Sequence, residues 1–240
     1  MSCDNYRELT QVLFDKVSCD DKENILIYEE GEMFSNIREF ARSFVGSGLV
    51  LNQRIVVVTA EPQMWSKIPK VQISSKSKKY DLTKEVDNNS AIQVINSSDK
   101  TEEQILLEVQ ETYEYGLESP EDDSLFRILI DDSKLMTNGF LYDLRYFSRR
   151  SSSTILFVAS SNEDKDFKPL IGYFDKTFEL NSIDENIEKT EGLIKITRYA
   201  NFANPSLCEN YGVGLQKALF WGFDSNNLIY FRDIDFTEVV

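Results

Sequence analysis

Two adjacent carboxylates are the residues of this chain best placed to do chemistry. Asp131 and Asp132 end the apolar run Arg127–Asp132, RILIDD. Aliphatic residues flanked by charge predict a short, buried strand. Its carboxyl end then lies at the sheet edge where open α/β folds bind ligands, and in nucleotide-binding folds an acid there coordinates magnesium. The competing interpretation is a solvated strand end or turn cap.

A magnesium-nucleotide site also needs a phosphate loop, and the sequence offers none. Such a loop lies between the first strand and the next helix, where glycines and a Lys-Ser or Lys-Thr pair hold the phosphates. At that place the chain has Glu29-Glu30-Gly31-Glu32, with one glycine, no lysine and three carboxylates. Carboxylates suit a helix N-terminus, where they interact favourably with the helix dipole, but they repel a triphosphate. The turn-cap interpretation of Asp131 and Asp132 is therefore favoured.

The composition excludes several other kinds of site. The 240 residues include no histidine, which removes the commonest general base, the commonest zinc ligand and every nucleophile–histidine pair. The three cysteines, Cys3, Cys19 and Cys208, form no CxxC pair and are expected to be free thiols in a reducing compartment. A formal net charge of −15 argues against a surface that binds nucleic acid by itself and favours a protein partner.

Hydrophobic residues make up 41% of the chain, which is enough to build a core. No apolar run approaches the roughly 20 residues that span a bilayer, and the N-terminal residues MSCDNYRELT lack the basic and apolar regions of a signal peptide. We therefore expect no membrane association and a location in the cytoplasm or the nucleus.

Hydrophobic periodicity predicts βα units followed by antiparallel strands. Strands are predicted at Asn24–Tyr28, Arg54–Thr59, Ala91–Ile95, Arg127–Asp132, Thr154–Ser160, Lys176–Leu180 and Gly192–Arg198, with a hairpin of Ala218–Phe223 and Leu228–Asp235. Helices are predicted at Tyr6–Val17, Met33–Phe44, Glu103–Tyr115 and Phe140–Phe147. The second of these is expected to end at Gly46-Ser47-Gly48, because glycine relieves a left-handed cap. We expect one α/β domain over residues 1–240, a mostly parallel central sheet with helices on both faces and an antiparallel meander at 192–236.

The segment Ser66–Ser90 is the one basic stretch of an acidic chain, and it is polar and weakly patterned. We expect residues 67–90 to form a solvated surface excursion. A contact with RNA or an acidic partner is the alternative, and Lys76, Lys78 and Lys79 are its candidate RNA contacts.

Six residues are candidate contacts with a partner protein. Two arginines follow the predicted helix Phe140–Phe147, either as charges that act on the helix dipole or as arginine fingers that reach a neighbour's nucleotide. The helix itself and the C-terminal hairpin are the other candidate surfaces, since aromatic residues are enriched at interfaces. The candidates are Arg149, Arg150, Phe140, Phe147, Trp221 and Phe223.

The order of segments resembles a known fold family. NILIY, a helix to GSGL, and the strands RIVVVTAE, RILIDD and STILFVAS resemble a RecA-type ATPase core that has lost its nucleotide motifs. The closing segments GLIKITR and ALFWGFDSNNLIYFRDIDF are similar to the last strands of the accessory subunits of Elongator, especially the sixth, and YRELTQVLF is similar to their N-terminal helix. The segment Lys67–Lys84 has no counterpart in this resemblance.

The resemblance implies a RecA-like three-layer domain that is not an enzyme and needs no cofactor or metal. It also implies a heterohexameric ring with two related subunits, Elongator subunits 4 and 5, that supports modification of wobble uridines in tRNA. The tRNA would be contacted through the assembled complex. The fifth Elongator subunit, recombinase paralogues, and sensory domains related to the circadian-clock ATPase fit nearly as well. In a sensory domain, Asp131 and Asp132 with Glu29–Glu32 would bind a ligand or a metal at the acidic sheet edge.

Overall fold

A computed structural model describes residues 24–30, 37–50, 53–73, 78–87, 92–115, 126–151, 153–161, 168–182, 192–199, 218–223 and 229–233, with side chains for part of them. The strands are β1 (Asn24–Glu30), β2 (Arg54–Thr59), β3 (Lys67–Ile73), β4 (Lys78–Asp87), β5 (Ile92–Asn96), β6 (Phe126–Asp131), β7 (Ser153–Ser161), β8 (Lys176–Ser182), β9 (Gly192–Tyr199), β10 (Ala218–Phe223) and β11 (Ile229–Asp233). The α-helices are α1 (Ile37–Val50), α2 (Glu102–Tyr115) and α3 (Asn138–Arg150). Three short 3₁₀ turns are η3 (Pro62–Trp65), η4 (Ser133–Leu135) and η5 (Lys168–Tyr173).

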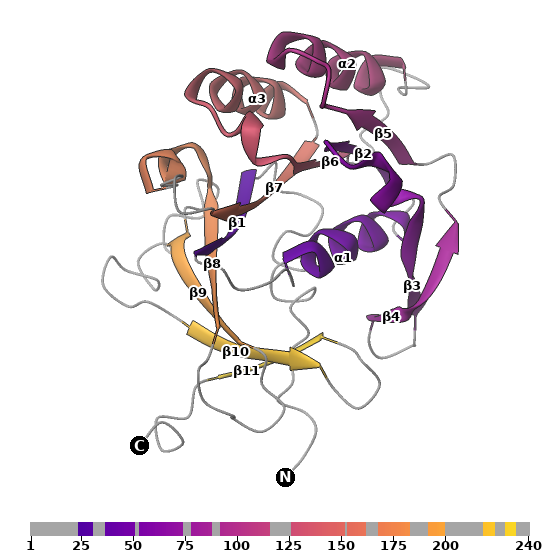
Figure 1. Cartoon of the computed structure of the whole chain (residues 1–240), viewed down its shortest axis with the longest axis vertical. Coiled ribbons are helices and arrows are strands. Elements are labelled where there is room, and N and C mark those ends of the chain that lie inside the picture. The colour runs from indigo at the N-terminus through magenta and orange to yellow at the C-terminus, as the bar shows by residue number, and fades with distance from the viewer. Residues whose placement is uncertain are drawn as a thin grey trace.

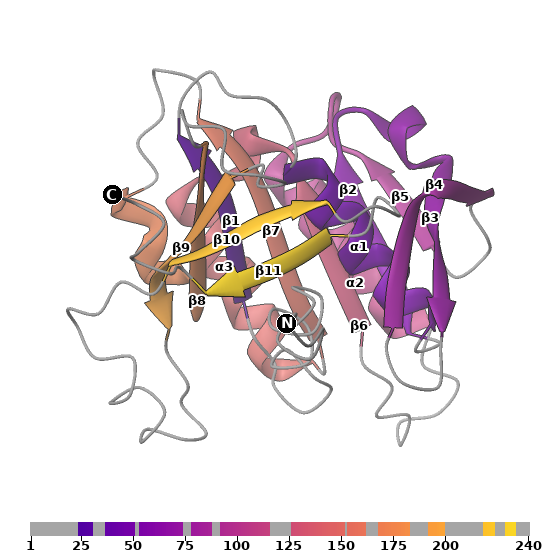
Figure 2. The same cartoon turned by 90° about the horizontal axis from the view of Figure 1, so that it is seen from below.

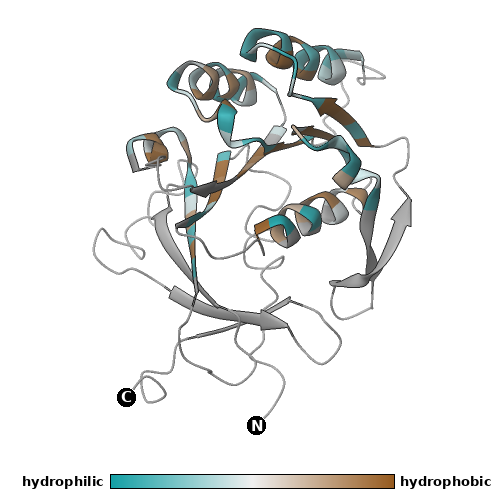
Figure 3. Cartoon of the chain, viewed as in Figure 1, coloured by the Kyte–Doolittle hydropathy of each residue, from teal (hydrophilic) through white to brown (hydrophobic). Residues whose placement is uncertain are grey.

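Nine of the described strands form one large sheet in the order β11-β10-β9-β8-β1-β7-β6-β2-β5, and β3 and β4 form a separate two-stranded sheet. From β8 to β5 all neighbours pair in parallel. The central strands carry near-continuous aliphatic runs because a parallel sheet is buried on both faces. Figure 3 shows these runs as the brown centre of the molecule.

Helices cover both faces of this sheet (Figure 1). Helix α1 packs over one face through residues such as Phe40 and Phe44, which join Leu129 of β6 in one core cluster. Helices α2 and α3 pack over the other face, where Ile105 and Phe140 join the second cluster. The predicted mostly parallel sheet with helices on both faces is therefore confirmed.

Beyond β8 the pairing changes to antiparallel. Strand β9 pairs antiparallel with β8, β10 with β9, and β11 with β10. Figure 2 shows β10 and β11 side by side at this end of the sheet. The predicted helix Tyr6–Val17 lies outside the described residues.

The lysine-rich segment, predicted as a surface excursion, contains two strands that the sequence analysis did not predict. Its residues form the antiparallel pair β3–β4, with a register shift between Pro69 and Lys70, and the pair lies beside α1. Backbone pairing satisfies the polar groups of a segment whose apolar residues, Ile68, Val71 and Ile73, are too scattered to predict strands.

Helix α1 does not end at the glycines, as the sequence predicted, but continues to Val50. Gly48 is in the helix because of close packing: a Cβ there would lie 2.8 Å from Cδ of Arg127 and 2.9 Å from Cδ1 of Ile55. The absent side chain lets α1 approach the sheet, and glycine has no capping role at this position. Among the described helices, none is both long and apolar enough to cross a membrane.

Substituting Gly48→Ala is expected to lower the free energy of unfolding by about 1 kcal/mol, because overpacking costs roughly 1–3 kcal/mol and the gain in helix propensity returns about 1 kcal/mol. The matched control is Gly139→Ala in α3, where the nearest heavy atom to a Cβ is 3.9 Å away. Urea unfolding of both variants measures the difference. A Gly48→Ala protein as stable as the Gly139→Ala protein would contradict the packing argument.

Candidate functional site at the carboxyl edge of the sheet

The carboxyl ends of β2, β5 and β6 meet at one edge of the sheet, as the sequence predicted for Asp131 and Asp132. The backbone N–H of Ser97, just after β5, donates to the carbonyl of Thr59 at the end of β2 (2.9 Å). The Ser97 hydroxyl donates to Oδ2 of Asp132, just after β6 (2.6 Å). These bonds fix the three strand ends relative to one another.

Asp132 serves as a cap. Its Oδ1 accepts a hydrogen bond from the backbone N–H of Lys134 (2.9 Å), so Asp132 is the N-cap of the turn η4. With Oδ2 bonded to Ser97, both carboxylate oxygens have partners within the protein. This arrangement supports the turn-cap interpretation for Asp132.

Asp131 has a different environment, although it is the next residue along the chain. Burial of its carboxyl raises the pKa from 3.8 to about 6, against the opposing effects of the Arg38 guanidinium and the Trp65 indole; the carboxylates of Glu61 and Asp132 raise the pKa further. Protein groups with such shifted pKa values cluster at functional sites, but structural charge networks produce them too. Asp131 is therefore the residue of this edge that most needs a functional or structural explanation.

Trp65 brings an indole N–H to this carboxyl. The side chain is 2% exposed, and its N–H has no hydrogen-bond partner of normal geometry. The indole is nevertheless close enough to lower the pKa of Asp131. Because the bond geometry is poor, we interpret this as a weak polar contact, which leaves a buried donor unsatisfied at the sheet edge.

Arg38 and Glu61 form the outer part of the cluster. Nη2 of Arg38, in the first described turn of α1, lies 2.9 Å from Oε2 of Glu61, and the two side chains are 42% and 48% exposed. The backbone N–H of Glu61 donates to the hydroxyl of Thr59 (3.0 Å), which fixes the turn after β2. The cation that lowers the pKa of Asp131 is thus an arginine that is also paired with Glu61.

The start of α1 shows what replaces the phosphate-binding residues. In the spacing G-x-x-x-x-G-K-[ST], counting from Gly31 puts Asn36 at the second glycine, Ile37 at the lysine and Arg38 at the hydroxyl residue. Ile37 is 5% exposed and packs in the core under α1. A buried isoleucine has no charge for a phosphate, and arginine has no hydroxyl for magnesium.

Comparisons with known proteins bear on the fold. No family model and no curated protein matches the chain. Among solved structures, a KaiC-like protein from the archaeon Pyrococcus horikoshii is similar with a TM-score of 0.54 and 11% identity, over 88% of this chain and 89% of that chain. A DnaB-like replicative helicase, solved with its interactions with primase, is similar with a TM-score of 0.53 and 12% identity. The chain has a RecA-like fold. The match to the helicase covers 89% of this chain and 58% of the helicase chain. At these sequence identities the likeness shows the fold alone.

The RecA-like domain shows no metal cluster at this edge: the described residues contain no group of three His, Cys, Asp or Glu side chains that could hold an ion. Of the Glu29–Glu32 segment, only the Glu29 side chain is described. The structure brings Asp131 together with Trp65, Arg38 and Glu61, three residues that the sequence analysis did not assign to a site. The sequence held a signal for Glu61 only, because RIVVVTAE puts this residue just beyond the end of a predicted strand.

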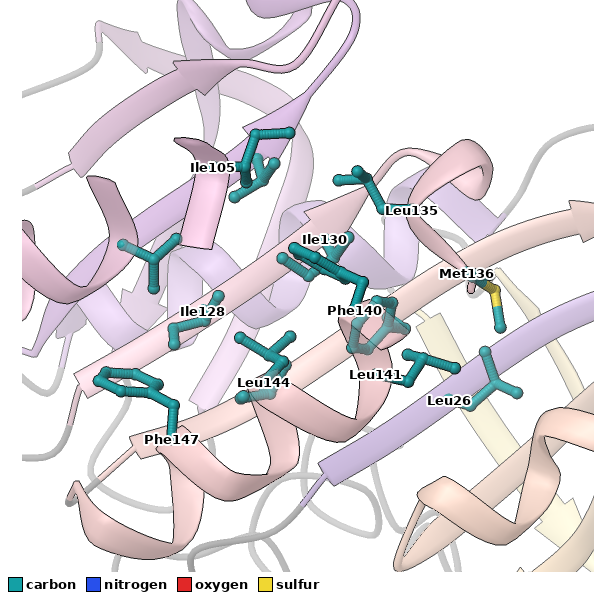
Figure 4. Packing of buried hydrophobic residues seen from close by; sticks show 14 of the residues in the cluster. Leu26, Ile105, Ile128, Ile130, Leu135, Met136, Phe140, Leu141, Leu144 and Phe147 are labelled. Carbon is teal, nitrogen blue, oxygen red and sulfur yellow. The ribbon is translucent and has the colours of Figure 1, made fainter. Parts of the chain in front are cut away.

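Two predicted partner contacts of the RecA-like domain need correction. Phe140 and Phe147 are 2% and 9% exposed, and Figure 4 shows both on the inner side of α3 with Leu144, against β6. Their helical spacing is that of a core stripe. The hydrophobic effect therefore places them inside the domain, where they cannot contact a partner.

The other predicted contacts have mixed outcomes. Arg149 and Arg150 are exposed in the last turn of α3. Trp221 and Phe223 lie in β10, and Lys78 and Lys79 lie in β4, but the side chains of all four are outside the described part. Lys76 is not among the described residues.

Removing Arg38 tests the electrostatics of the edge. We expect Arg38→Ala to raise the pKa of Asp131 beyond about 6, since Arg38 lowers it. The free energy of unfolding should change by less than about 1 kcal/mol, because the ion pair is largely exposed. The pKa is measured from the carboxyl carbon resonance by NMR, and Arg150→Ala controls for the loss of one positive charge. An unchanged or lower pKa would exclude Arg38 as the compensating cation.

Proposed function

We propose that the chain is a non-catalytic subunit of a RecA-like hetero-oligomeric ring, the accessory subcomplex of Elongator, which supports modification of wobble uridines in tRNA. In this proposal its partners are two related subunits, Elongator subunits 4 and 5. The chain needs no cofactor, and tRNA is contacted through the assembled complex, in the cytoplasm or nucleus.

The observation that carries the non-catalytic part is Ile37. The position of the phosphate-binding lysine holds an aliphatic side chain buried in the core, and Asp132, one of the two acids at the strand end, has both oxygens occupied as a cap. Phosphoryl transfer depends on positioning and neutralising the phosphates. Without the lysine, a RecA-like fold retains its shape but not this chemistry.

The Elongator part rests on the sequence. The segments GLIKITR and ALFWGFDSNNLIYFRDIDF, with YRELTQVLF near the N-terminus, carry the resemblance to the accessory subunits, most of all the sixth. The net charge of −15 also supports a role within a protein assembly, because RNA binding by a single chain is typically carried by a basic domain.

The test is affinity purification of the tagged full-length chain from its native cell, with mass spectrometry and light scattering of the eluate. Two further RecA-like proteins in stoichiometric amounts are expected, and the purified chain should show no shift in melting temperature with magnesium and ATP. A monodisperse monomer without partners would reject the ring, and a saturable ATP-dependent shift would reject the non-catalytic assignment.

The second candidate is a sensory or regulatory domain that binds a ligand or metal at the acidic edge. The observation that favours it is the pairing of Asp131, whose pKa is raised to about 6, with the buried Trp65 N–H that lacks a regular partner. Titration with calcium or magnesium distinguishes the candidates. A saturable rise in thermal stability that Asp131→Asn abolishes would favour the sensory domain.

A further inference from the structure

The outer side of α3 carries a stripe of large exposed side chains. Tyr142 and Tyr146 are 65% and 57% exposed, and Arg149 and Arg150 are exposed one turn further on. The spacing puts them along one side of the helix. We name these four residues the α3 stripe.

The side chain of Arg150 is held in place by the ring and the hydroxyl of Tyr146. Its guanidinium carbon lies 5.2 Å from the ring centroid of Tyr146, and its Nη1 donates to the Tyr146 hydroxyl (2.8 Å). In the described part of the chain Arg150 forms no ion pair with a carboxylate. Stacking on a ring fixes the planar fork of donors that recognises a carboxylate with two bonds.

The helix below the stripe is rigidly attached. The Thr137 hydroxyl accepts from the backbone N–H of Phe140 and caps the first turn (3.2 Å). Arg145 ties the side of the helix to η5, through the carbonyl of Gly172 (2.9 Å), and to the residue before β8, through the carboxylate of Asp175 (3.3 Å). Side chains on such a scaffold lose little conformational entropy when a partner binds.

The chemistry of the stripe favours an acidic protein over a nucleic acid. Tyrosine and arginine are enriched among the residues that dominate binding energy at protein interfaces. The neighbouring helix α2 exposes Glu103, Glu111 and Glu114, which repel the continuous negative charge of a phosphate backbone. A protein can instead place a few carboxylates on the arginines at the end of α3 and uncharged residues opposite α2.

We propose that the α3 stripe is the docking surface for a protein partner that presents carboxylates, with Tyr146 and Arg150 as its anchor. The proposal rests on the assembly function above and identifies one surface through which the chain joins it. Tyr142 extends the aromatic contact, and Arg149 adds charge at its end.

The experiment combines variants with crosslinking in the native cell. Tagged chains carry Arg150→Glu, Arg150→Gln or Tyr146→Ala, and Tyr115→Ala on α2, which removes a tyrosine that is 90% exposed, is the control. A benzophenone amino acid in place of Tyr142 maps the neighbouring peptide. We expect at least about a tenfold loss of co-purified partner with each α3 variant, none with the control, and crosslinks to an Asp- or Glu-rich peptide of another protein.

The outcomes separate this inference from the proposed function. If all α3 variants retain RecA-like partners, the α3 stripe is not the docking surface, and the proposed ring remains supported. An acidic partner outside the RecA-like group, lost with Arg150→Glu, would support the stripe and overturn the ring. Crosslinks to RNA or to a second copy of the chain, or no protein partner at all, would overturn the stripe. Each variant is first matched to the wild type in thermal unfolding; should Tyr146→Ala not fold, Tyr146→Phe with Arg150→Gln serves in its place.

Discussion

Replacing Arg127 with methionine is expected to lower the free energy of unfolding by about 2–4 kcal/mol. The Arg127 side chain is 3% exposed and connects β6 to two other segments. Its Nε donates to the side-chain oxygen of Gln53, and its Nη1 donates to the carbonyl of Phe44 in α1 (2.8 Å). The guanidinium also lies 4.8 Å from the ring centroid of Phe44. Methionine fills most of the stem volume but donates no hydrogen bond, and each buried group left without a partner costs about 1–3 kcal/mol.

A double variant separates the hydrogen bonds from the packing. Adding Gln53→Leu to Arg127→Met removes one unsatisfied acceptor, so part of the lost stability should return, as a positive coupling in a double-mutant cycle. Arg127→Lys keeps the charge but not the fork of donors, and an intermediate loss is expected. Urea denaturation measures these three variants and Gln53→Leu alone, which completes the cycle. A loss below about 1 kcal/mol for Arg127→Met would mean that desolvation of the guanidinium cancels its bonds.

Arg127 also illustrates which features the sequence could predict. The strands of the parallel sheet were predicted closely, and Arg54–Thr59 matches β2 residue for residue, because runs buried on both faces need only local apolar content. The same pattern treated Arg127 as a flanking charge. Its burial depends on Gln53 and on a carbonyl of α1, which come from distant parts of the chain, and no local pattern records those contacts.

The end of α1 has the same explanation. Gly48 favours a cap by local propensity, but the contact with Arg127 and Ile55 requires a residue without Cβ inside the helix. Tertiary packing overrides propensity here. By contrast, the burial of Phe140 and Phe147 was predictable, because with Leu144 they repeat at helical spacing.

The candidate site was predicted only in outline. The sequence correctly placed Asp131 and Asp132 at the end of a strand, but it could not assign them different environments. Alternation along β6 puts Asp131 on the side of Leu129 and α1, near Trp65, while Asp132 turns to Ser97 and the start of η4. Trp65 and Arg38 reach Asp131 from separate elements, so their roles follow from the three-dimensional arrangement alone.

Asp131→Asn is expected to stabilise the protein at neutral pH, by roughly 2–3 kcal/mol at about 1.4 kcal/mol per pKa unit. The carboxyl has a folded-state pKa of about 6 against an ordinary value of 3.8, mainly because of burial. An acid with a raised folded-state pKa loses its proton in the unfolded chain first. Stability therefore falls as the pH rises from about 4 to about 6, and the loss is complete above that window. Asparagine has no ionisable group, so the Asp131→Asn variant does not lose stability in this pH window.

Thermal and urea unfolding of wild type and variant between pH 5 and 8 measure this difference, a range that stays above the pI near 4.5. The stability of the variant relative to the wild type should rise up to about pH 6, the folded-state pKa of Asp131, and level off above it. Asp143→Asn, on the exposed side of α3, controls for the loss of one negative charge. A stability difference that does not change with pH, or a variant less stable at pH 8, would contradict a buried carboxyl as the cause.

The same variant tests the role of the edge in assembly. If the chain is a non-catalytic ring subunit, Asp131→Asn should co-purify the same partners as the wild type, because the α3 stripe and the strand β10 lie on other elements. Loss of assembly by a folded variant would instead assign Asp131 to an interface. If the variant is more stable and still assembles, the ionised carboxyl of Asp131 in the wild type costs stability and contributes nothing to the ring. The unsatisfied Trp65 N–H beside it would then be the feature of this edge to test with small ligands, since a ligand that accepts its hydrogen bond would remove the cost of a buried donor without a partner.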